Sequence, residues 1–386
     1  MAVQNGTVMA FSVLYLPLVR EFAEGRGVVA AVQSGVVLLL GLGAPFAGAA
    51  LDRWGPRRLF QGGAALAALG LLLASQATSL PLLVLTYGVL AGAGLSTLGS
   101  PPNMLVVAQW FPHRRGRAIA LADLGTPLGT FALVPLSQLL VDRLGWRASL
   151  GILAGLLLVV VVPVNGLQRL PPATHAQSAS ADTRSVAGAV RTPAFWWLAA
   201  LRFFTGVGFA LINLHAVALA VDAGVAALVA AAALGSVAVV SLAGRLAVGW
   251  LTDHLGPARA LSLSFGSGLV GIGCLAGLAA TGRPAWLAAF VLFYGLAQGS
   301  GGIVATAAAT AAFHGPAVGA ITGWIAVASG PGEALGAWGG GALYDWTGGY
   351  GYALLLAGAA LVAGVASAWQ AQRQEGLHAD APTHPR

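Results

Sequence analysis

Lysine is missing from this chain of 386 residues, and all nineteen basic residues are arginine. Without lysine there is neither a P-loop lysine for phosphate nor a lysine Schiff base, which excludes the usual ATP-driven pumps. Cysteine is nearly missing too. The one copy, Cys274, lies inside an apolar run, so disulfides and cysteine metal sites are excluded.

Charge is scarce as well. Only 8% of the residues are charged, whereas 58% are hydrophobic and the mean hydropathy is +0.82. A soluble domain has about 25% charged residues, so most of this surface must face lipid rather than water. The net charge of +7 is then first a topology signal, and we expect the lipid bilayer, not nucleic acid, to be the partner.

Long apolar runs fill the chain. A helix needs about 20 apolar residues to cross the ~30 Å hydrocarbon core of a bilayer. Twelve candidate runs lie near 1–19, 29–51, 59–78, 81–110, 117–141, 148–168, 193–216, 224–252, 260–281, 285–312, 316–344 and 350–370. The sequence therefore predicts an all-α membrane protein of about twelve transmembrane helices.

The runs divide the chain at a polar stretch. We expect an N-terminal six-helix half over 1–168, a linker over 169–192, a C-terminal six-helix half over 193–370, and a disordered polar tail over 371–386. The first run offers only about 18 residues, or ~27 Å of helix. We expect either a short first helix or a native start upstream of Met1, and we favour the upstream start.

Arginines are unevenly shared between alternate loops. One set has twelve members and the other has five; two more, Arg202 and Arg245, fall inside runs. The larger set is Arg53, Arg57, Arg58, Arg114, Arg115, Arg117, Arg169, Arg184, Arg191, Arg259, Arg373 and Arg386. Because cytoplasmic loops carry the excess of positive charge, we expect both termini and the linker in the cytoplasm of a bacterial inner membrane.

Two segments repeat. Residues 48–58 (GAALDRWGPRR) and 249–259 (GWLTDHLGPAR) are offset by 201, and glycine, aspartate, proline and arginine recur in register. A fainter echo pairs 142–145 with 345–348 at an offset of 203. One copy could be merely a tight basic turn; two copies at matched places favour a repeated, pseudo-symmetric half. We expect the first glycine of each copy to let a neighbouring helix approach closely.

These loops resemble the signature loop of the major facilitator superfamily, and the likeness spans essentially the whole chain. Further segments resemble the bacterial branch of the monocarboxylate porters and oxalate–formate antiporters: 110–118 (WFPHRRGRA), 145–147 (GWR), 195–197 (FWW) and Gly244-Arg245. The resemblance implies a monomeric secondary transporter of a small organic anion. It also implies that spans one, four, seven and ten line the cavity. The expected conformational gate is Gly48, Asp52, Arg53, Gly55, Arg57, Arg58, Gly249, Asp253, Gly256 and Arg259.

Four ionisable residues lie inside the runs: Asp123, Arg202, Arg245 and Glu333. Such groups are costly in a membrane, so each is a functional candidate. Arg245 lies eight residues before Asp253, about 12 Å inside its helix. A guanidinium there can hold a carboxylate through two parallel hydrogen bonds. The resemblance places a substrate-binding arginine at this position; snorkelling or a structural ion pair is the alternative.

The other three are less specific. Glu333 could carry a coupled proton or be a permanent partner of an arginine. Asp123 is a second candidate for proton coupling, although a structural pair near the gate is the more common role for such a residue. Arg202 fits snorkelling or carboxylate pairing as well as it fits substrate contact. Neutral candidates for substrate binding are Asn103, Asn213, His215, Tyr294 and Gln298, and interhelical hydrogen bonding is their alternative.

The chain also departs from the resembled families. The animal-type monocarboxylate porters have a lysine in span one and an aspartate one turn before the span-eight arginine, where this chain has Ser241. The second cation of the oxalate–formate type is missing too, so a lone Arg245 favours a monocarboxylate. Proton-driven export of hydrophobic compounds is the alternative function, with a loose echo of its span-five motif at 125–129 (GTPLG). No catalytic, cofactor or metal constellation supports an enzyme or a receptor.

Overall fold

The computed structural model describes residues 1–111, 114–169, 183–313 and 317–379. Within these ranges the regular elements are all helices. The first part of the chain folds into α1 (Ala2–Phe22), α2 (Arg26–Ser75), α3 (Leu80–Leu83), η1 (Val84–Ala91), α4 (Gly92–Thr97), α5 (Ser100–Trp110), α6 (Arg115–Asp123), α7 (Gly125–Leu156), η2 (Leu157–Val161) and α8 (Val162–Gly166).

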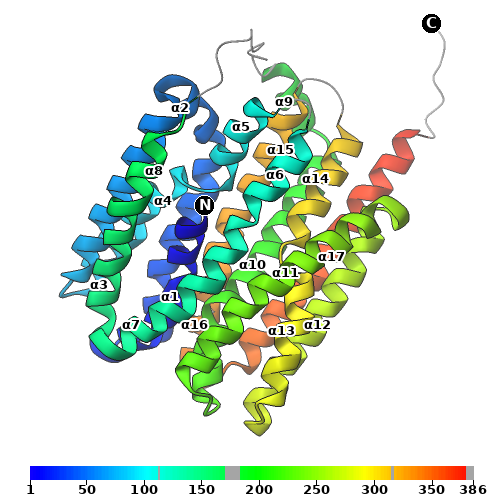
Figure 1. Ribbon diagram of the computed structural model, residues 1–386. Helices are drawn as coiled ribbons and strands as arrows, with labels where there is room; N and C mark the ends of the chain where they lie inside the picture. The colour runs from blue at the N-terminus through cyan, green and yellow to red at the C-terminus, as the bar shows by residue number, and fades with distance from the viewer. Residues whose placement is uncertain (112–113, 170–182, 314–316, 380–386) are drawn as a thin grey trace, which may run out of the picture.

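A short helix, α9 (Thr183–Val190), precedes the second half. That half comprises α10 (Pro193–Asp222), α11 (Ala227–Leu255), α12 (Pro257–Thr281), α13 (Ala285–Ala297), α14 (Ser300–Ala312), α15 (Val318–Val327), α16 (Ser329–Thr347) and α17 (Gly351–Ala379). Figure 1 shows the long helices side by side in one tilted bundle. The start of α10 matches its sequence signal, because Thr192 accepts a hydrogen bond from the Phe195 amide and Pro193 stands at the first helical position.

Within the described residues, ten helices are long and apolar enough to cross a membrane. One of them, 117–166, has 50 residues and turns at Gly145 (φ 82°), so it makes two crossings. The helices α15 and α16 together make one more. The prediction of an all-α membrane protein with about twelve crossings in two halves is therefore confirmed.

Glycine makes the sharp turns between crossings. Gly55 (φ 73°, ψ 163°) bends α2, and Gly256 (φ 83°, ψ 162°) separates α11 from α12. These two residues are equivalent in the repeat, since 256 minus 55 is 201. Residues with a Cβ rarely adopt this backbone conformation, which explains why both copies have glycine here.

The two ends of the bundle are distinct (Figure 1). We call the end with the Gly55 turn and α9 the linker end, and the end with the α1–α2 connection the Arg26 end. The halves pack together mainly through α2 against α16 and α7 against α11. Where α2 crosses α16, a Cβ on Gly330 would lie 2.9 Å from the Cα of Gly41, so the two backbones touch.

Three expectations need correction. α1 has 21 residues rather than about 18, because the chain remains helical through Arg20 and Glu21. The tail expected to be disordered from 371 is helical to Ala379, as a continuation of α17; residues 380–386 lie outside the described ranges. Finally, a Cβ on Gly249 would meet open space, so this glycine does not permit a close approach of helices in this conformation.

Candidate functional site

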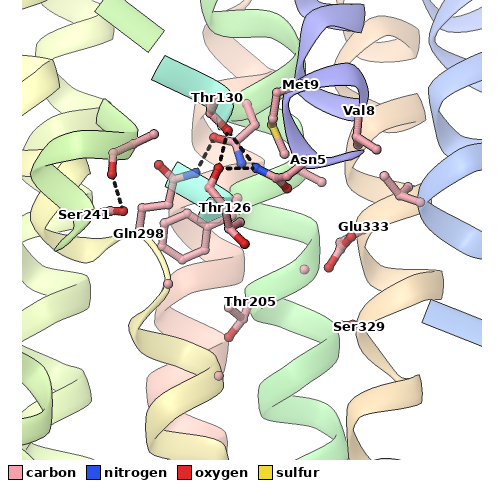
Figure 2. A pocket seen from close by; sticks show the side chains of 18 of the residues that line it. Asn5, Val8, Met9, Thr126, Thr130, Thr205, Ser241, Gln298, Ser329 and Glu333 are labelled. Atoms are coloured by element: carbon pink, nitrogen blue, oxygen red, sulfur yellow. Dashed lines mark hydrogen bonds between the residues drawn. The ribbon is translucent and has the colours of Figure 1, made fainter. Parts of the chain in front are cut away.

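A cavity of about 320 Å³ lies in the middle of the bundle, between the two halves. The first half contributes α1, α2 and α7, and the second half contributes α10, α11, α16 and the break between α13 and α14. Figure 2 shows polar side chains from both halves turned toward this space, including Asn5, Thr130, Gln298 and Glu333. Spans one, seven and ten line the cavity as expected, but span four contributes no lining residue among those described.

Arg245 lines this cavity from the middle of α11 and forms an ion pair with Asp123. Asp123 ends α6 in the first half, 122 residues earlier in the chain, so the pair joins the two halves. The guanidinium Nη1 donates to one carboxylate oxygen, and the hydroxyl of Thr126 lies 3.4 Å from the other. The two side chains keep 27% and 30% of their surface exposed, so neither is sealed away from the cavity.

The opposite edge of the Arg245 guanidinium faces Gly299. Its Nε is buried and has no hydrogen-bond partner within the described residues. A Cβ on Gly299 would lie 2.6 Å from Nε and 3.1 Å from Nη2. Gly299 has φ 89°, and it separates α13 from α14. Gly299 therefore packs directly against the Nε–Nη2 edge with no side chain between them. The Nε donor is left unpaired, and this is the edge whose geometry suits a carboxylate bound by two parallel hydrogen bonds.

A second pair of ionisable residues, Arg202 and Glu333, lines the cavity from the second half alone. They come from α10 and α16, which pack tightly: a Cβ on Gly206 would lie 2.8 Å from the Ser329 carbonyl oxygen and 3.2 Å from Glu333 Cγ. No ion pair joins Arg202 to Glu333, and the Arg202 guanidinium has no hydrogen-bond partner in the described part of the chain. The four ionisable residues thus form one paired set and one unpaired set.

Neutral polar residues form two further groups. Asn213 accepts hydrogen bonds at its Oδ1 from the Tyr294 hydroxyl (3.2 Å) and the Gln298 Nε2 (3.2 Å). Asn213 and Gln298 line the cavity, whereas Tyr294 is fully buried behind them and positions Asn213. In the first half, Asn5 donates to Thr130 Oγ1 (2.7 Å) and to the Thr126 carbonyl oxygen (3.2 Å).

Several lining residues were missed by the sequence reasoning. Asn5, Thr126, Thr130 and Gln33 line the cavity, and Gln33 Oε1 is buried without a partner within the described residues. The signal available in the sequence was a polar residue in span one and two threonines in span five, but a single sequence does not show which helix faces meet.

Two of the predicted substrate residues lie elsewhere. His215 is buried behind the cavity, where its Nε2 lies 2.9 Å from the Ala337 carbonyl oxygen and its ring packs edge-on against Tyr15. Asn103 donates to the carbonyl oxygens of Leu98 and Gly99 and so closes the helix break before α5. His215 thus makes the interhelical hydrogen bond that was the alternative interpretation, whereas Asn103 bonds locally, within four or five residues of its own position.

The expected gate lies at the linker end. Among its charged residues, Arg53, Arg57, Arg58, Asp253 and Arg259 are exposed, and none of them forms an ion pair with another described residue. The surroundings of Gly48 and of the Asp52 side chain are not among the described features. In the described part of the chain there is also no cluster of His, Cys, Asp and Glu that could hold a metal ion.

A membrane-spanning bundle of two pseudo-symmetric six-helix halves around a polar central cavity defines a class of transport proteins. Residues 1–330 match the Major Facilitator Superfamily, and the chain belongs to this family. Its members are transporters rather than enzymes, so the protein is a multi-pass membrane transporter.

Related proteins of known name are monocarboxylate transporters. Monocarboxylate transporter 13 of Bos taurus is 30% identical over 359 residues, which is 93% of this chain and 84% of that protein. Monocarboxylate transporter 3 of Rattus norvegicus is 38% identical over 153 residues, which is 40% of this chain and 31% of that protein.

Solved structures support the fold. A mutant of the nucleoside transporter NupG superimposes with a TM-score of 0.76 at 12% identity, covering 97% of both chains. A bacterial homologue of the human lysosomal transporter Spinster, in an inward-facing and occupied conformation, gives 0.68 at 15% identity, covering 98% of this chain and 94% of that one.

Proposed function

We propose that the protein is a secondary transporter of a small organic anion, a monocarboxylate, and that it works as a monomer. The observation that carries the proposal is the unpaired Nε–Nη2 edge of Arg245 in a cavity between the two halves. The names of the related transporters, over 93% of the chain in one case, support the same substrate class. We further propose a bacterial inner membrane, with both termini in the cytoplasm.

Asp123 fits this function as the residue that orients Arg245. By holding Nη1, its carboxylate fixes the plane of the guanidinium and leaves the donors of the Nε–Nη2 edge unused. A substrate carboxylate can then bind Nε and Nη2 without displacing Asp123. We therefore propose that Asp123 positions Arg245, which leaves Glu333 as the remaining carboxylate for proton coupling.

Transport would follow from rocking of the halves around the central cavity. The ion pair between Arg245 and Asp123 crosses the interface between the halves, so substrate binding at Arg245 acts where the halves must move. The repeated loops at the linker end remain our proposed gate. Their glycine turns are alike in both halves, which supports an equivalent mechanical role for the two loops.

The test is carboxylate binding to purified variants. Replacing Arg245 with alanine removes both hydrogen-bond donors, so we expect binding to weaken by about 1.5–3 kcal/mol, the scale of charge-assisted hydrogen bonds. Arg245→Lys should recover part of this loss, because an ammonium lacks the bidentate edge. Binding is measured by isothermal calorimetry in detergent with a panel of monocarboxylates, after thermal melts confirm folding.

The matched control is Arg283→Ala, since Arg283 is exposed and lies outside the cavity. This variant should bind as the unaltered protein does. If Arg245→Ala binds every carboxylate of the panel as tightly as the unaltered protein, the anion site is wrong. Export of hydrophobic compounds would then be the better explanation of the cavity.

A further inference from the structure

Arg202 is a deep cation that the proposed anion site does not use. It lies on α10 and lines the cavity. Its Nη1 lies near the first turn of α14, where a Cβ on Gly302 would approach it to 3.2 Å. Nothing among the described residues accepts a hydrogen bond from it. An unpaired guanidinium away from bulk water is costly, so its retention in the cavity calls for a function.

Its nearest counter-charge is Glu333, on the neighbouring helix. The backbones of α10 and α16 touch, because a Cβ on Gly206 would collide with α16 at Glu333 and Ser329. The helices therefore hold the two side chains in one neighbourhood. They do not form an ion pair, so Arg202 remains able to turn to a substrate group and Glu333 remains able to take up a proton.

The other groups around Glu333 are known. The α1 and α2 faces of the cavity carry uncharged Asn5, Ser12 and Gln33. The α11 face carries Arg245, whose charge Asp123 already balances through an ion pair. Arg202 is thus the one cation in the described cavity wall that is not committed to another carboxylate.

The charges of the cavity cancel when it is empty: two arginines face two carboxylates. An incoming monocarboxylate adds one negative charge to a site inside the membrane-spanning bundle, which is unfavourable unless a proton enters too. Since Asp123 is paired with Arg245, Glu333 is the carboxylate of the cavity that can accept the proton. It adds to a carboxylate oxygen of Glu333, and no bond in the protein breaks.

We propose that Arg202 couples the substrate to this proton: it balances Glu333 in the empty cavity and turns to the substrate anion when the cavity fills. Glu333 then loses its counter-charge and takes up a proton, and release of the substrate reverses both steps. The inference rests on the proposed function. Arg245 holds the substrate, and Arg202 responds to the charge of the bound anion and acts on the proton through Glu333.

The experiment uses proteoliposomes containing the full-length protein and a radiolabelled monocarboxylate that the unaltered protein transports. Two processes are measured: accumulation driven by a pH gradient, and exchange without a gradient. One coupled proton per substrate allows about tenfold accumulation per pH unit. In Arg202→Gln we expect accumulation to fall to equality across the membrane, while exchange continues.

Glu333→Gln should behave in the same way, and the double variant should be no worse than either single variant, because both break one coupled step. Arg202→Lys should restore part of the accumulation, since it keeps the charge. Arg283→Ala is the neutral control.

The outcomes separate the two proposals. If the unaltered protein moves no carboxylate, the proposed function fails and the inference fails with it. Full gradient-driven accumulation in Arg202→Gln overturns the inference alone. So does loss of exchange in Arg202→Gln when Glu333→Gln keeps it, because Arg202 would then be needed for binding or folding and not for coupling.

Discussion

At Gly299, the lack of a side chain affects how a carboxylate can bind the Arg245 guanidinium. It separates two helices with a left-handed backbone, and its Cα lies against the free edge of the Arg245 guanidinium. In Gly299→Ala the new methyl group would lie 2.6 Å from Nε, where the substrate carboxylate is expected. We expect carboxylate binding to weaken by about tenfold or more, equivalent to about 1.4 kcal/mol. Calorimetric titration with the transported monocarboxylate measures this.

The substitution also has a folding cost, which a matched variant controls. Gly348 has a similar left-handed backbone (φ 74°, ψ 11°), but a Cβ there would meet nothing within 4 Å. Both alanine variants should lose about 1–2 kcal/mol of stability from the backbone alone. Only Gly299→Ala should lose binding. Equal binding in the two variants would show that the glycine does not keep the arginine accessible.

At the residue scale, the sequence predicted which residues lie inside the membrane spans better than it predicted which neighbours their side chains contact. Arg245, Asp123, Arg202 and Glu333 could all be found because charge inside an apolar run is rare. That Arg245 meets Asp123 could not be found, because the two are 122 residues apart and meet only through helix packing. The prediction that His215 lines the cavity differs from the structure for a related reason. Its helix has one face on the cavity and another on neighbouring helices, and position along the span does not distinguish the two faces.

At the scale of elements, the Arg26 end is held by a contact between the halves. Arg26, the first residue of α2, grips Asp222 at the end of α10 with two hydrogen bonds (2.6 and 3.1 Å). Its guanidinium carbon also lies 3.7 Å from the centre of the Tyr344 ring. The backbone amides of Arg26 and Gly27 both donate to the Asp345 carboxylate at 2.8 Å. An aspartate of the second half therefore caps a helix of the first half.

This contact should hold the Arg26 end closed, so breaking it should favour a state in which the end is open. Only 12% of the Arg26 side chain is exposed, so removal of its charge in Arg26→Gln should cost the closed state about 1–3 kcal/mol. Spin labels on Ser79→Cys and Thr281→Cys, both exposed at this end in different halves, would report the change. We expect a longer distance population to grow in double electron–electron resonance measurements.

A matched ion pair within one half provides the control. Arg147 pairs with Glu21 at the same end, but both residues belong to the first half. Arg147→Gln removes a comparable charge without cutting a link between halves. The label distances should stay as in the unaltered protein. A similar shift in both variants would mean that general loosening, not release of the Arg26 contact, had opened the end.

The sequence showed that the segment at Asp142 is repeated at Asp345, but it did not show that the two aspartates make different contacts. The glycines that follow them have different backbones: Gly145 has ψ 166°, whereas Gly348 has ψ 11°. Asp142 accepts a hydrogen bond from Gln138 on its own helix, while Asp345 reaches across to α2. Two similar sequence segments thus have different hydrogen-bond partners, because different helices pack beside them.

At the scale of the whole molecule, the repeat extends to the contacts between helices. A Cβ on Gly129 would collide with the Ala2 carbonyl group, and one on Gly332 with the Phe203 carbonyl group. The offsets are those of the sequence echoes, since 332 minus 129 is 203 and 203 minus 2 is 201. Sequence could predict this symmetry because glycine marks close approach in both copies.

Function depends on where the symmetry fails. By the same offsets, Glu333 corresponds to Thr130, and Gly206 corresponds to Asn5. In the first half these positions hold a neutral hydrogen bond between Asn5 and Thr130. In the second half they hold a carboxylate packed against a bare glycine. Arg245 corresponds to Ala44, so a shared architecture does not require it either. The charged residues of the cavity are additions to the repeat, which favours a role in transport over a role in folding.

The orientation of the whole molecule is the last prediction. By sequence, twelve loop arginines belong to the set that includes the linker and both termini, and five belong to the set that includes Arg26. Because positively charged loops stay in the cytoplasm, we expect the linker end inside the cell. Single cysteines at Ser79 and Leu255, in a Cys274→Ser background, mark the two ends, and both positions are exposed. In intact bacterial cells a membrane-impermeant thiol reagent should label S79C and should label L255C only after permeabilisation. Labelling of L255C alone in intact cells would reverse the orientation and place the proposed gate on the outer face.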